Sequence, residues 1–470
     1  MEEYRLETDA LGTVRVPAGA YYGAQTQRAL ENFPISGMRM PREFIRALGI
    51  VKQAAAEANL ELGLLPVRIA EAIIRAAGEV AEGKFDGDFV VDVYQTGSAT
   101  SSNMNANEVI ANRAIELLGG RIGSKSPVHP NDHVNLGQSS NDVIPTAIHV
   151  AALDSIERAL LPALEQLRRV LDEKARAFDD VVKIGRTHLQ DAVPIRMGQE
   201  FSGYASQVEH SLERLAGLRP HLRELALGGT AVGTGLNTAP QFPALAVGKI
   251  AARTGIPFVC ARNYFEALAA RDALVEASGQ LKTVAVSLFK IANDLRWLAS
   301  GPRCGIGEIR LPALQPGSSI MPGKVNPVIA ESTMMLCATV MGNDVAVNIG
   351  GQNGNFELNT MMPMMACHVL ESVRLLSNGT RNLAERCVAG IEVDRERAES
   401  LVAGSLALVT PLVPYVGYDT AAAIAQEAYR SGRTVFEVVR ERTALPEEHL
   451  RRILDPRRLT EPGFVKPEYA

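Results

Sequence analysis

Apolar residues recur every three or four positions over long stretches in the middle of the chain. One stripe consists of Leu153, Ile156, Leu160, Leu164, Leu167 and Leu171. A second consists of Leu281, Val284, Leu288, Ile291, Leu295 and Leu298. This spacing places the apolar side chains on one face of an α-helix. The stretch from Phe265 to Leu298 has no proline and one glycine, so it predicts one long helix, and residues 331–348 predict another.

Strand patterns are few and short, and only residues 13–16 alternate weakly. The predicted class is therefore mainly α, with long helices that form a central bundle. Clusters of glycine and proline predict loops near residues 119–130, 228–243, 301–327 and 350–354. Shorter helical patterns follow residue 393. We expect three domains, at residues 1–138, 139–393 and 394–470.

Composition restricts the partners of the chain. Of the 470 residues, 46% are hydrophobic and 21% are charged, and the formal net charge is −5, which argues against nucleic acid or an anionic membrane surface as a partner. No apolar stretch reaches the ~18 residues of a membrane span, and no leader pattern precedes Tyr4, so we expect a cytoplasmic protein. The five cysteines are scattered and predict reduced thiols. Long bundle helices also favour a symmetric oligomer.

Two motifs suggest common binding sites but do not fit them. The glycine-rich run at residues 228–235 has neither of the two spacings that cradle nucleotide phosphates. His129 and His133 are four positions apart, but Pro130 follows the first and no metalloprotease motif is present. No metal site is expected there. A turn that caps the next helix and an anion-binding site both remain open for residues 129–133.

The segment Gly317–Pro327 has an unusual mixture of residues. Its glycines and prolines hold two hydroxyls, one ammonium and one carboxamide, from Ser318, Ser319, Lys324 and Asn326. A hydrophobic core needs none of these groups. A loop that closes over an anion does, because lysine supplies charge while the amide and backbone N–H groups supply oriented donors.

Three further segments are rich in hydroxyl and amide side chains, at residues 97–105, 138–142 and 185–191. The first two precede helical patterns, where free N–H groups favour a carboxylate. The third carries His188, and a lone histidine is more often structural. We interpret all four polar segments as helix starts, and together they predict one dicarboxylate pocket at the ends of the bundle.

The run GSSIMPGKVNP at residues 317–327 resembles the fingerprint of the fumarase/aspartase superfamily. The resemblance extends from about residue 5 to the C-terminus, and it implies the three-domain fold of that superfamily and a multi-helix tetramer core. Within the superfamily the chain resembles the class II fumarases, through residues 129–132, 139–142, 228–230, 265–297 and 354–359. Ser101 and residues 328–330 are more similar to aspartases.

The resemblance implies reversible hydration of fumarate to (S)-malate, by anti addition and elimination through an aci-carboxylate carbanion, in the tricarboxylic acid cycle. It implies no cofactor or metal, and a homotetramer whose active sites each draw on three chains. Aspartate ammonia-lyase is the alternative enzyme. A structural protein that kept the bundle and lost catalysis is the other alternative, and Ser318, His188 and Lys324 argue against it.

The resemblance also assigns roles to residues. Ser318 matches the base, His188 the acid, Glu331 the partner that orients His188, and Lys324 the cation at the reacting carboxylate. The positions that match substrate-binding residues are Ser98, Ala99, Thr100, Ser139, Ser140, Asn141, Thr187, Ser319, Val325 and Asn326. A second anion site is implied at His129, Pro130, Asn131 and Asp132. Ala99 replaces the glycine usual in class II fumarases, and Ser126 and Pro127 stand where a basic residue normally precedes the second anion site.

Overall fold

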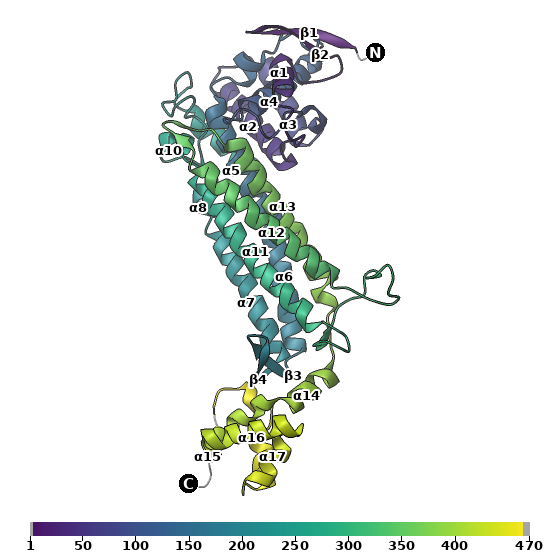
Figure 1. Cartoon of the computed structure of the whole chain (residues 1–470). Coiled ribbons are helices and arrows are strands. Elements are labelled where there is room, and N and C mark those ends of the chain that lie inside the picture. The colour runs from purple at the N-terminus through teal and green to yellow at the C-terminus, as the bar shows by residue number, and fades with distance from the viewer. Residues whose placement is uncertain (1–2, 464–470) are drawn as a thin grey trace. The chain divides into compact units, whose positions relative to one another are not determined.

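The computed structural model describes residues 3–463, so Met1, Glu2 and the last seven residues of the predicted C-terminal domain lie outside it. Helices dominate the described chain, which confirms the mainly α class (Figure 1). The chain divides into two compact units. The first consists of Met1–Pro162, Ser211–Ala285 and Leu336–Ser377, and the second of Ala163–His210, Val286–Met335 and Asn378–Ala470. The predicted boundaries near residues 138 and 393 stay a prediction.

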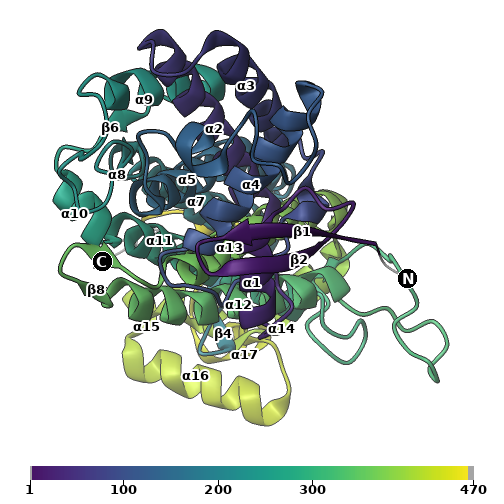
Figure 2. The ribbon, with the colours of Figure 1, turned by 90° about the horizontal axis from the view of Figure 1, so that it is seen from above.

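The first unit begins with a hairpin of two antiparallel strands, β1 (Tyr4–Asp9) and β2 (Gly12–Pro17). The predicted alternation at residues 13–16 lies in β2, with Val14 and Val16 buried. The hairpin packs on the first helix, α1, as seen from above in Figure 2. The helices that follow are α1 (Ala24–Asn32), α2 (Arg42–Glu61), α3 (Val67–Ala81) and α4 (Thr100–Leu117).

The first predicted stripe forms a nearly continuous helical run. Its parts are α5 (Ser140–Ser155), the π-helix η3 (Ile156–Leu160) and α6 (Leu161–Ala177), and all six apolar residues of the stripe are fully buried. Burying a side chain of this size contributes about 1.5–3 kcal/mol. The widened π-turn ends two residues before Pro162, which has no N–H to continue the regular ladder.

The second stripe is also buried, but the predicted helix from Phe265 is interrupted. A short helix, α10 (Tyr264–Ala269), ends at Ala270, and α11 (Asp272–Leu298) begins afresh. The prediction of a single long helix was therefore wrong for its first residues. The side chain of Asn263 caps α10 by accepting hydrogen bonds from the N–H groups of Phe265 and Glu266. No proline or glycine marks the break, so the helical pattern did not reveal it.

The third predicted helix is α12 (Val328–Gly351), slightly longer than expected. In the first unit Asp344 of α12 accepts a hydrogen bond from Ser278 and pairs with Lys282, which ties α12 to α11. The remaining helices before residue 394 are α7 (Met197–Ala216), α8 (Arg219–Leu222), α9 (Phe242–Thr254) and α13 (Met362–Arg386). Short strands are β5 (Glu224–Leu225), β6 (Val259–Cys260), β7 (Ile309–Arg310), β8 (Gly354–Asn355), β9 (Leu358–Asn359) and β10 (Glu392–Val393).

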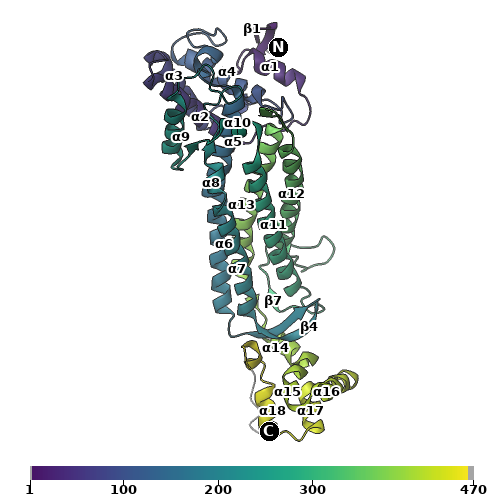
Figure 3. The ribbon, with the colours of Figure 1, turned by 90° about the vertical axis from the view of Figure 1, so that its left-hand side faces the viewer.

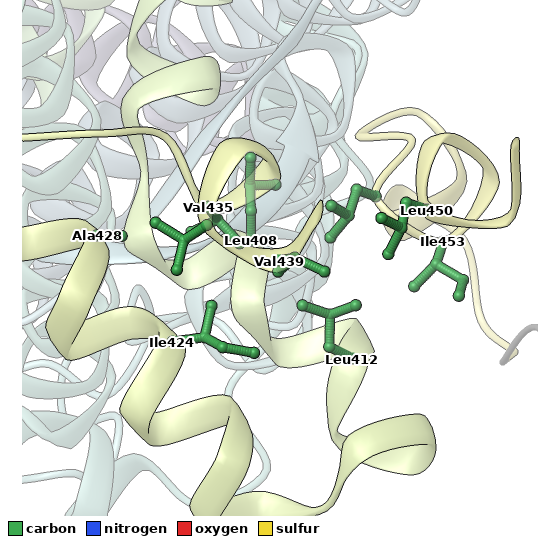
Figure 4. Packing of buried hydrophobic residues seen from close by; sticks show 10 residues of the cluster. Leu408, Leu412, Ile424, Ala428, Val435, Val439, Leu450 and Ile453 are labelled. Atoms are coloured by element: carbon green, nitrogen blue, oxygen red, sulfur yellow. The ribbon is translucent and has the colours of Figure 1, made fainter. Parts of the chain in front are cut away.

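A separate apolar cluster holds the C-terminal helices of the second unit together. Leu412, Ile424, Val435, Val439 and Leu450 converge in it, as Figure 4 shows. The helices of this cluster are α15 (Val413–Val416), α16 (Tyr418–Ser431), α17 (Val435–Arg442) and α18 (Glu447–Ile453), and α14 (Arg395–Gly404) precedes them. The two segments predicted as short helices lie in α16 and α17.

Within residues 3–463, no single helix is long and apolar enough to span a membrane. One pair, Arg395–Gly404 with Leu406–Val416, meets that test only when its two parts are joined across a bend of 62°.

Candidate active site

A chain of hydroxyl groups joins the starts of α4 and α5 in the first unit. The Oγ of Ser98 lies 2.8 Å from the Oγ1 of Thr100, which lies 2.7 Å from the Oγ of Ser140. Thr100 is the first residue of α4 and Ser140 is the first of α5. These two helix starts agree with the sequence prediction. The free N–H groups of both helices and the shared hydroxyls can receive one carboxylate.

Ala99 precedes α4 with φ +54°, in the left-handed region, and its side chain is fully buried. Glycine adopts this conformation with little strain, whereas alanine does so at a cost. The glycine usual in class II fumarases therefore fits the backbone at this position, and Ala99 keeps the same turn with a methyl group inside it.

Asp142 fixes the turn that begins α5. Its Oδ1 accepts from the N–H of Ser139, completing a capping box, and its Oδ2 accepts from the N–H groups of Gly228 and Thr230 at 2.9 Å each. Asn141 donates to the carbonyl oxygen of Ala231 at 2.8 Å. The glycine-rich run at 228–235 thus presents N–H groups to a buried carboxylate of the protein itself.

Lys52 is a buried cation beneath this turn that sequence reasoning missed. Its Nζ donates to the Oδ1 of Asn135 at 2.9 Å and to the Oε1 of Gln138 at 3.0 Å, next to Ser139. Burial lowers the pKa of Lys52 to about 7, and burial raises the pKa of Asp142 to about 6. A charged residue among the apolar positions of α2 was the only available signal, and such residues usually face solvent.

We expect the stability of the protein to depend on pH through Lys52. Between pH 7 and 10.5 the unfolded lysine holds a proton that the folded one releases, so the free energy of unfolding rises with pH in this window. The slope is at most about 1.4 kcal/mol per pH unit. Urea unfolding at fixed protein concentration measures it, and Lys52→Met removes the rise. If the free energy of unfolding changes with pH in the same way in the unmodified protein and in Lys52→Met, the lowered pKa of Lys52 is contradicted.

The run at residues 129–133 forms a cap. His129 precedes the π-helix η2 (Pro130–Val134), and its Nδ1 accepts from the N–H groups of Asn131 and Asp132 at 3.2 Å each. The N–H of His129 donates to the Nδ1 of His133 at 2.8 Å. Pro130 starts the helical turn, where a missing N–H costs nothing. The capping interpretation is confirmed, and anion binding at this place stays a prediction.

The segment with His188 is the tip of a β-hairpin in the second unit, so its interpretation as a helix start was wrong. Strand β3 (Val182–Thr187) pairs with β4 (Gln190–Arg196), and Thr187 lies opposite Gln190. His188 and Leu189 form the two-residue turn with φ +56° and +58°, which matches the twist of the strands. Figures 1 and 3 show this hairpin beside α14.

His188 and Thr187 are exposed, and within residues 3–463 His188 makes no hydrogen bond or ion pair. The base of the hairpin is rigid by contrast. The buried carboxylate of Glu308 accepts from both terminal nitrogens of Arg186, at 2.8 and 3.1 Å, and lies 3.4 Å from the ammonium of buried Lys183. This ion network holds the strands and leaves the histidine at the tip available to a ligand.

The loop at residues 317–327 folds on itself. The Oγ of Ser318 accepts from the N–H groups of Ile320 and Met321, at 3.3 and 3.0 Å. The N–H of Gly317 donates to the carbonyl oxygen of Lys324 at 2.7 Å, and the side chain of Asn326 donates to the carbonyl oxygen of Gly317 at 2.6 Å. Gly317 is required at this closure, because a Cβ there would lie 2.7 Å from the carbonyl oxygen of Lys324.

Two backbone N–H groups aimed at one hydroxyl oxygen stabilise negative charge on that oxygen. Ser319, Lys324 and Val325 are exposed around it, and Glu331 lies exposed in the first turn of α12. Among the residues that the structure describes, neither Lys324 nor Glu331 has a side-chain hydrogen bond or ion pair. Each unit thus carries part of the predicted site, with hydroxyls and helix starts in the first, and Ser318, Lys324 and His188 in the second.

Comparison with known proteins agrees with these features. The family model described as "Lyase" matches residues 12–342, and the model "Fumarase C C-terminus" matches residues 408–461. The fumarate hydratase class II of Nitrosomonas europaea is 57% identical over 98% of this chain and 100% of its own length. The mitochondrial fumarate hydratase of Homo sapiens is 54% identical over 98% of this chain and 90% of its own.

Among solved structures, the class II fumarase of Schistosoma mansoni superposes with a TM-score of 0.95 at 41% identity, covering 97% of this chain and 99% of that one. The long helices, the loop at 317–327 and the "Lyase" match together define a lyase. The full-length identities are more specific: the chain belongs to the family of class II fumarate hydratases.

Proposed function

We propose that the chain catalyses the reversible hydration of fumarate to (S)-malate, a hydro-lyase reaction of the tricarboxylic acid cycle. Full-length identity of 57% to a class II fumarate hydratase supports this activity. The observation that carries the mechanism is the Oγ of Ser318, which accepts two backbone N–H groups inside a loop that also bears Lys324.

The chemical difficulty in malate is a weakly acidic proton next to a carboxylate. Its removal places a second negative charge on that carboxylate, so stabilising this aci-carboxylate is the main task of the site. A neutral serine hydroxyl is too weak a base. Ser318 becomes competent as an alkoxide, held by its two N–H donors and by the charge of Lys324 in a closed, dry pocket.

The proton balance follows from these roles. The Oγ of Ser318 takes the C–H proton, and Lys324 and Asn326 hold the carboxylate on which charge accumulates. His188 gives a proton to the departing hydroxyl, which leaves as water, while Glu331 orients the imidazole. Hydration runs the same steps in reverse. The second carboxylate is bound by the hydroxyl and helix-start groups of Ser98, Ala99, Thr100, Ser139, Ser140 and Asn141, together with Thr187, Ser319 and Val325.

We also propose that the site is completed between chains of a homotetramer, with segments from three chains at each active site. One face of α12 supports assembly. Ala338, Gly342, Val345 and Ile349 recur at spacings of four, three and four and are all exposed, with Val345 at 60% and Ile349 at 52%. This is the spacing of a helix seam that packs against other helices. Sedimentation at working concentration is expected to give four copies.

Two further assignments complete the proposal. Residues 129–132 form a second anion site close to the first, where the N–H groups of Asn131 and Asp132 are already capped by His129, so we expect weak binding. The compartment is the cytoplasm. No cofactor takes part, and the substrate is the small dicarboxylate.

One spectrophotometric assay decides between the two lyases. Absorbance of the fumarate double bond is followed with malate or with aspartate as the only substrate. We expect fumarate from malate alone, and the comparisons do not favour the aspartase alternative. Fumarate from aspartate at a comparable rate would contradict the proposed substrate, and inactivity on both would favour a structural protein.

A further inference from the structure

The first unit contains a cavity that is lined by residues which the proposed reaction does not use. Its volume is about 280 Å³, and its walls come from α5, α8, β5, α10 and the start of α11. The volume is below the ~300–1,000 Å³ typical of sites for drug-sized ligands, so an occupant would be a small metabolite.

The wall of the cavity contains an unusual buried cation. Arg271, at the break between α10 and α11, is 2% exposed. Its Nη2 donates to the carbonyl oxygen of Ala267, and its Nε has no hydrogen-bond partner among the described residues. Within residues 3–463 it forms no ion pair. Burial lowers the pKa of Arg271 to about 10. The carboxylates of Glu266 and Asp272 act on its charge only without contact, so within the described residues the buried guanidinium has no hydrogen-bonded counter-anion, which is costly.

The neighbouring histidine adds no charge to the cavity. His149 on α5 is hydrogen-bonded through Nδ1 to the carbonyl oxygen of Glu224 at 2.8 Å. Burial and the charge of Arg271 lower the pKa of His149 to about 4, so the imidazole is neutral at physiological pH. Its Nδ1–H is the donor in that bond, and the ring adds polarity to the wall without balancing Arg271.

The rim of the cavity has the opposite character. The carboxylate of Glu224 forms an ion pair with Arg262, and the carboxylate of Glu276 is hydrogen-bonded to Nδ1 of His221 at 2.5 Å. Glu266 and Asp272 also line the cavity, are exposed, and form no ion pair in the described part of the chain. A buried guanidinium without an ion pair therefore lines a cavity whose rim carries two carboxylates that form no ion pair in the described part of the chain.

We infer that this cavity binds a small zwitterionic amino acid, with its carboxylate on Arg271 and its ammonium between Glu266 and Asp272. A simple anion satisfies only the guanidinium and is repelled by the rim. A simple amine satisfies only the rim. A zwitterion complements both ends, and charge-assisted hydrogen bonds of this kind are the strong ones.

The test is calorimetric titration of the full-length protein with L-alanine, with acetate and ethylamine as half-ligands. Alanine has one carboxylate, which separates this cavity from a dicarboxylate site. We expect alanine to bind at least about tenfold more tightly than either half-ligand, the factor that one charged hydrogen bond provides. Saturating malate leaves this binding unchanged. Displacement of alanine by malate, or acetate binding as tightly as alanine, overturns the inference.

Variants locate the binding. Arg271→Met approximately keeps the volume of the side chain and is expected to weaken the binding of alanine at least about tenfold. Because Arg271 is buried, its replacement can also disturb folding. The double variant Glu266→Gln with Asp272→Asn changes only exposed residues, so it provides an independent test and is also expected to weaken the binding of alanine. The control is Glu71→Gln with Glu213→Gln, which removes the same formal charge from exposed positions outside the cavity. Unchanged alanine affinity in the rim variant, or no binding by the unmodified protein, overturns the inference whether or not the chain hydrates fumarate.

Discussion

Replacement of Ser318 by alanine is expected to abolish malate turnover, lowering kcat by ~10³-fold or more, because the reaction loses its only proposed base. The loop should keep its shape. Its closure rests on Gly317, Lys324 and Asn326, whose hydrogen bonds involve the backbone of residues 317 and 324 and the Asn326 amide, not the Ser318 hydroxyl. Steady-state rates on malate measure the loss of turnover, and sedimentation of the same samples shows whether the oligomer is intact.

The control for this variant is Ser332→Ala. Ser332 is an exposed hydroxyl on the first turns of α12, outside the proposed site, and its removal should leave the rate within a few-fold of the unmodified protein. Full activity of Ser318→Ala would remove the serine from the mechanism. Loss of the oligomer in Ser318→Ala would instead show that the hydroxyl has a structural role.

Replacement of His188 by asparagine should lower kcat by ~10²–10⁴-fold, the usual contribution of a positioned acid or base. Asparagine is the appropriate substitution because His188 has φ +56°, and asparagine tolerates this left-handed conformation better than most residues. The loss of activity is then caused by removal of the imidazole and not by a change in the turn. Leu189→Asn, at φ +58° in the same turn, is the matched control and should retain nearly full activity. Equal rates for the two variants would exclude His188 as the acid.

Mixing the two inactive variants tests whether the site is shared between chains. If Ser318 and His188 at one site come from different chains, random oligomers of Ser318→Ala and His188→Asn subunits contain some sites with both native residues. At equal mixing about one quarter of the sites are intact, so about one quarter of the activity should return. No recovery after the subunits exchange would show that both residues of a site belong to one chain.

The sequence alone was sufficient for features that depend on local pattern. The stripes from Leu153 to Leu171 and from Leu281 to Leu298 predicted buried helix faces, because a spacing of three and four residues needs no knowledge of the partner surface. The helix starts at Thr100 and Ser140 were also found, and the second has a local cause, since Ser139 and Asp142 cap α5 within one turn. The family was identified from residues 317–327, whose glycines, prolines and polar groups have no use in a hydrophobic core.

Features that depend on distant residues were missed or mistaken. His188 lies at the tip of a hairpin because β3 pairs with β4, and Glu308, far along the chain, forms ion pairs with Arg186 and Lys183 at the base. Lys52 and Asp142 became buried ionisable groups only when Asn135, Gly228 and Thr230 came to them. The buried guanidinium of Arg271 has the same origin. Sequence pattern records which surface a residue prefers, whereas burial and charge pairing are set by segments that meet only after folding, so tertiary structure alone decided them.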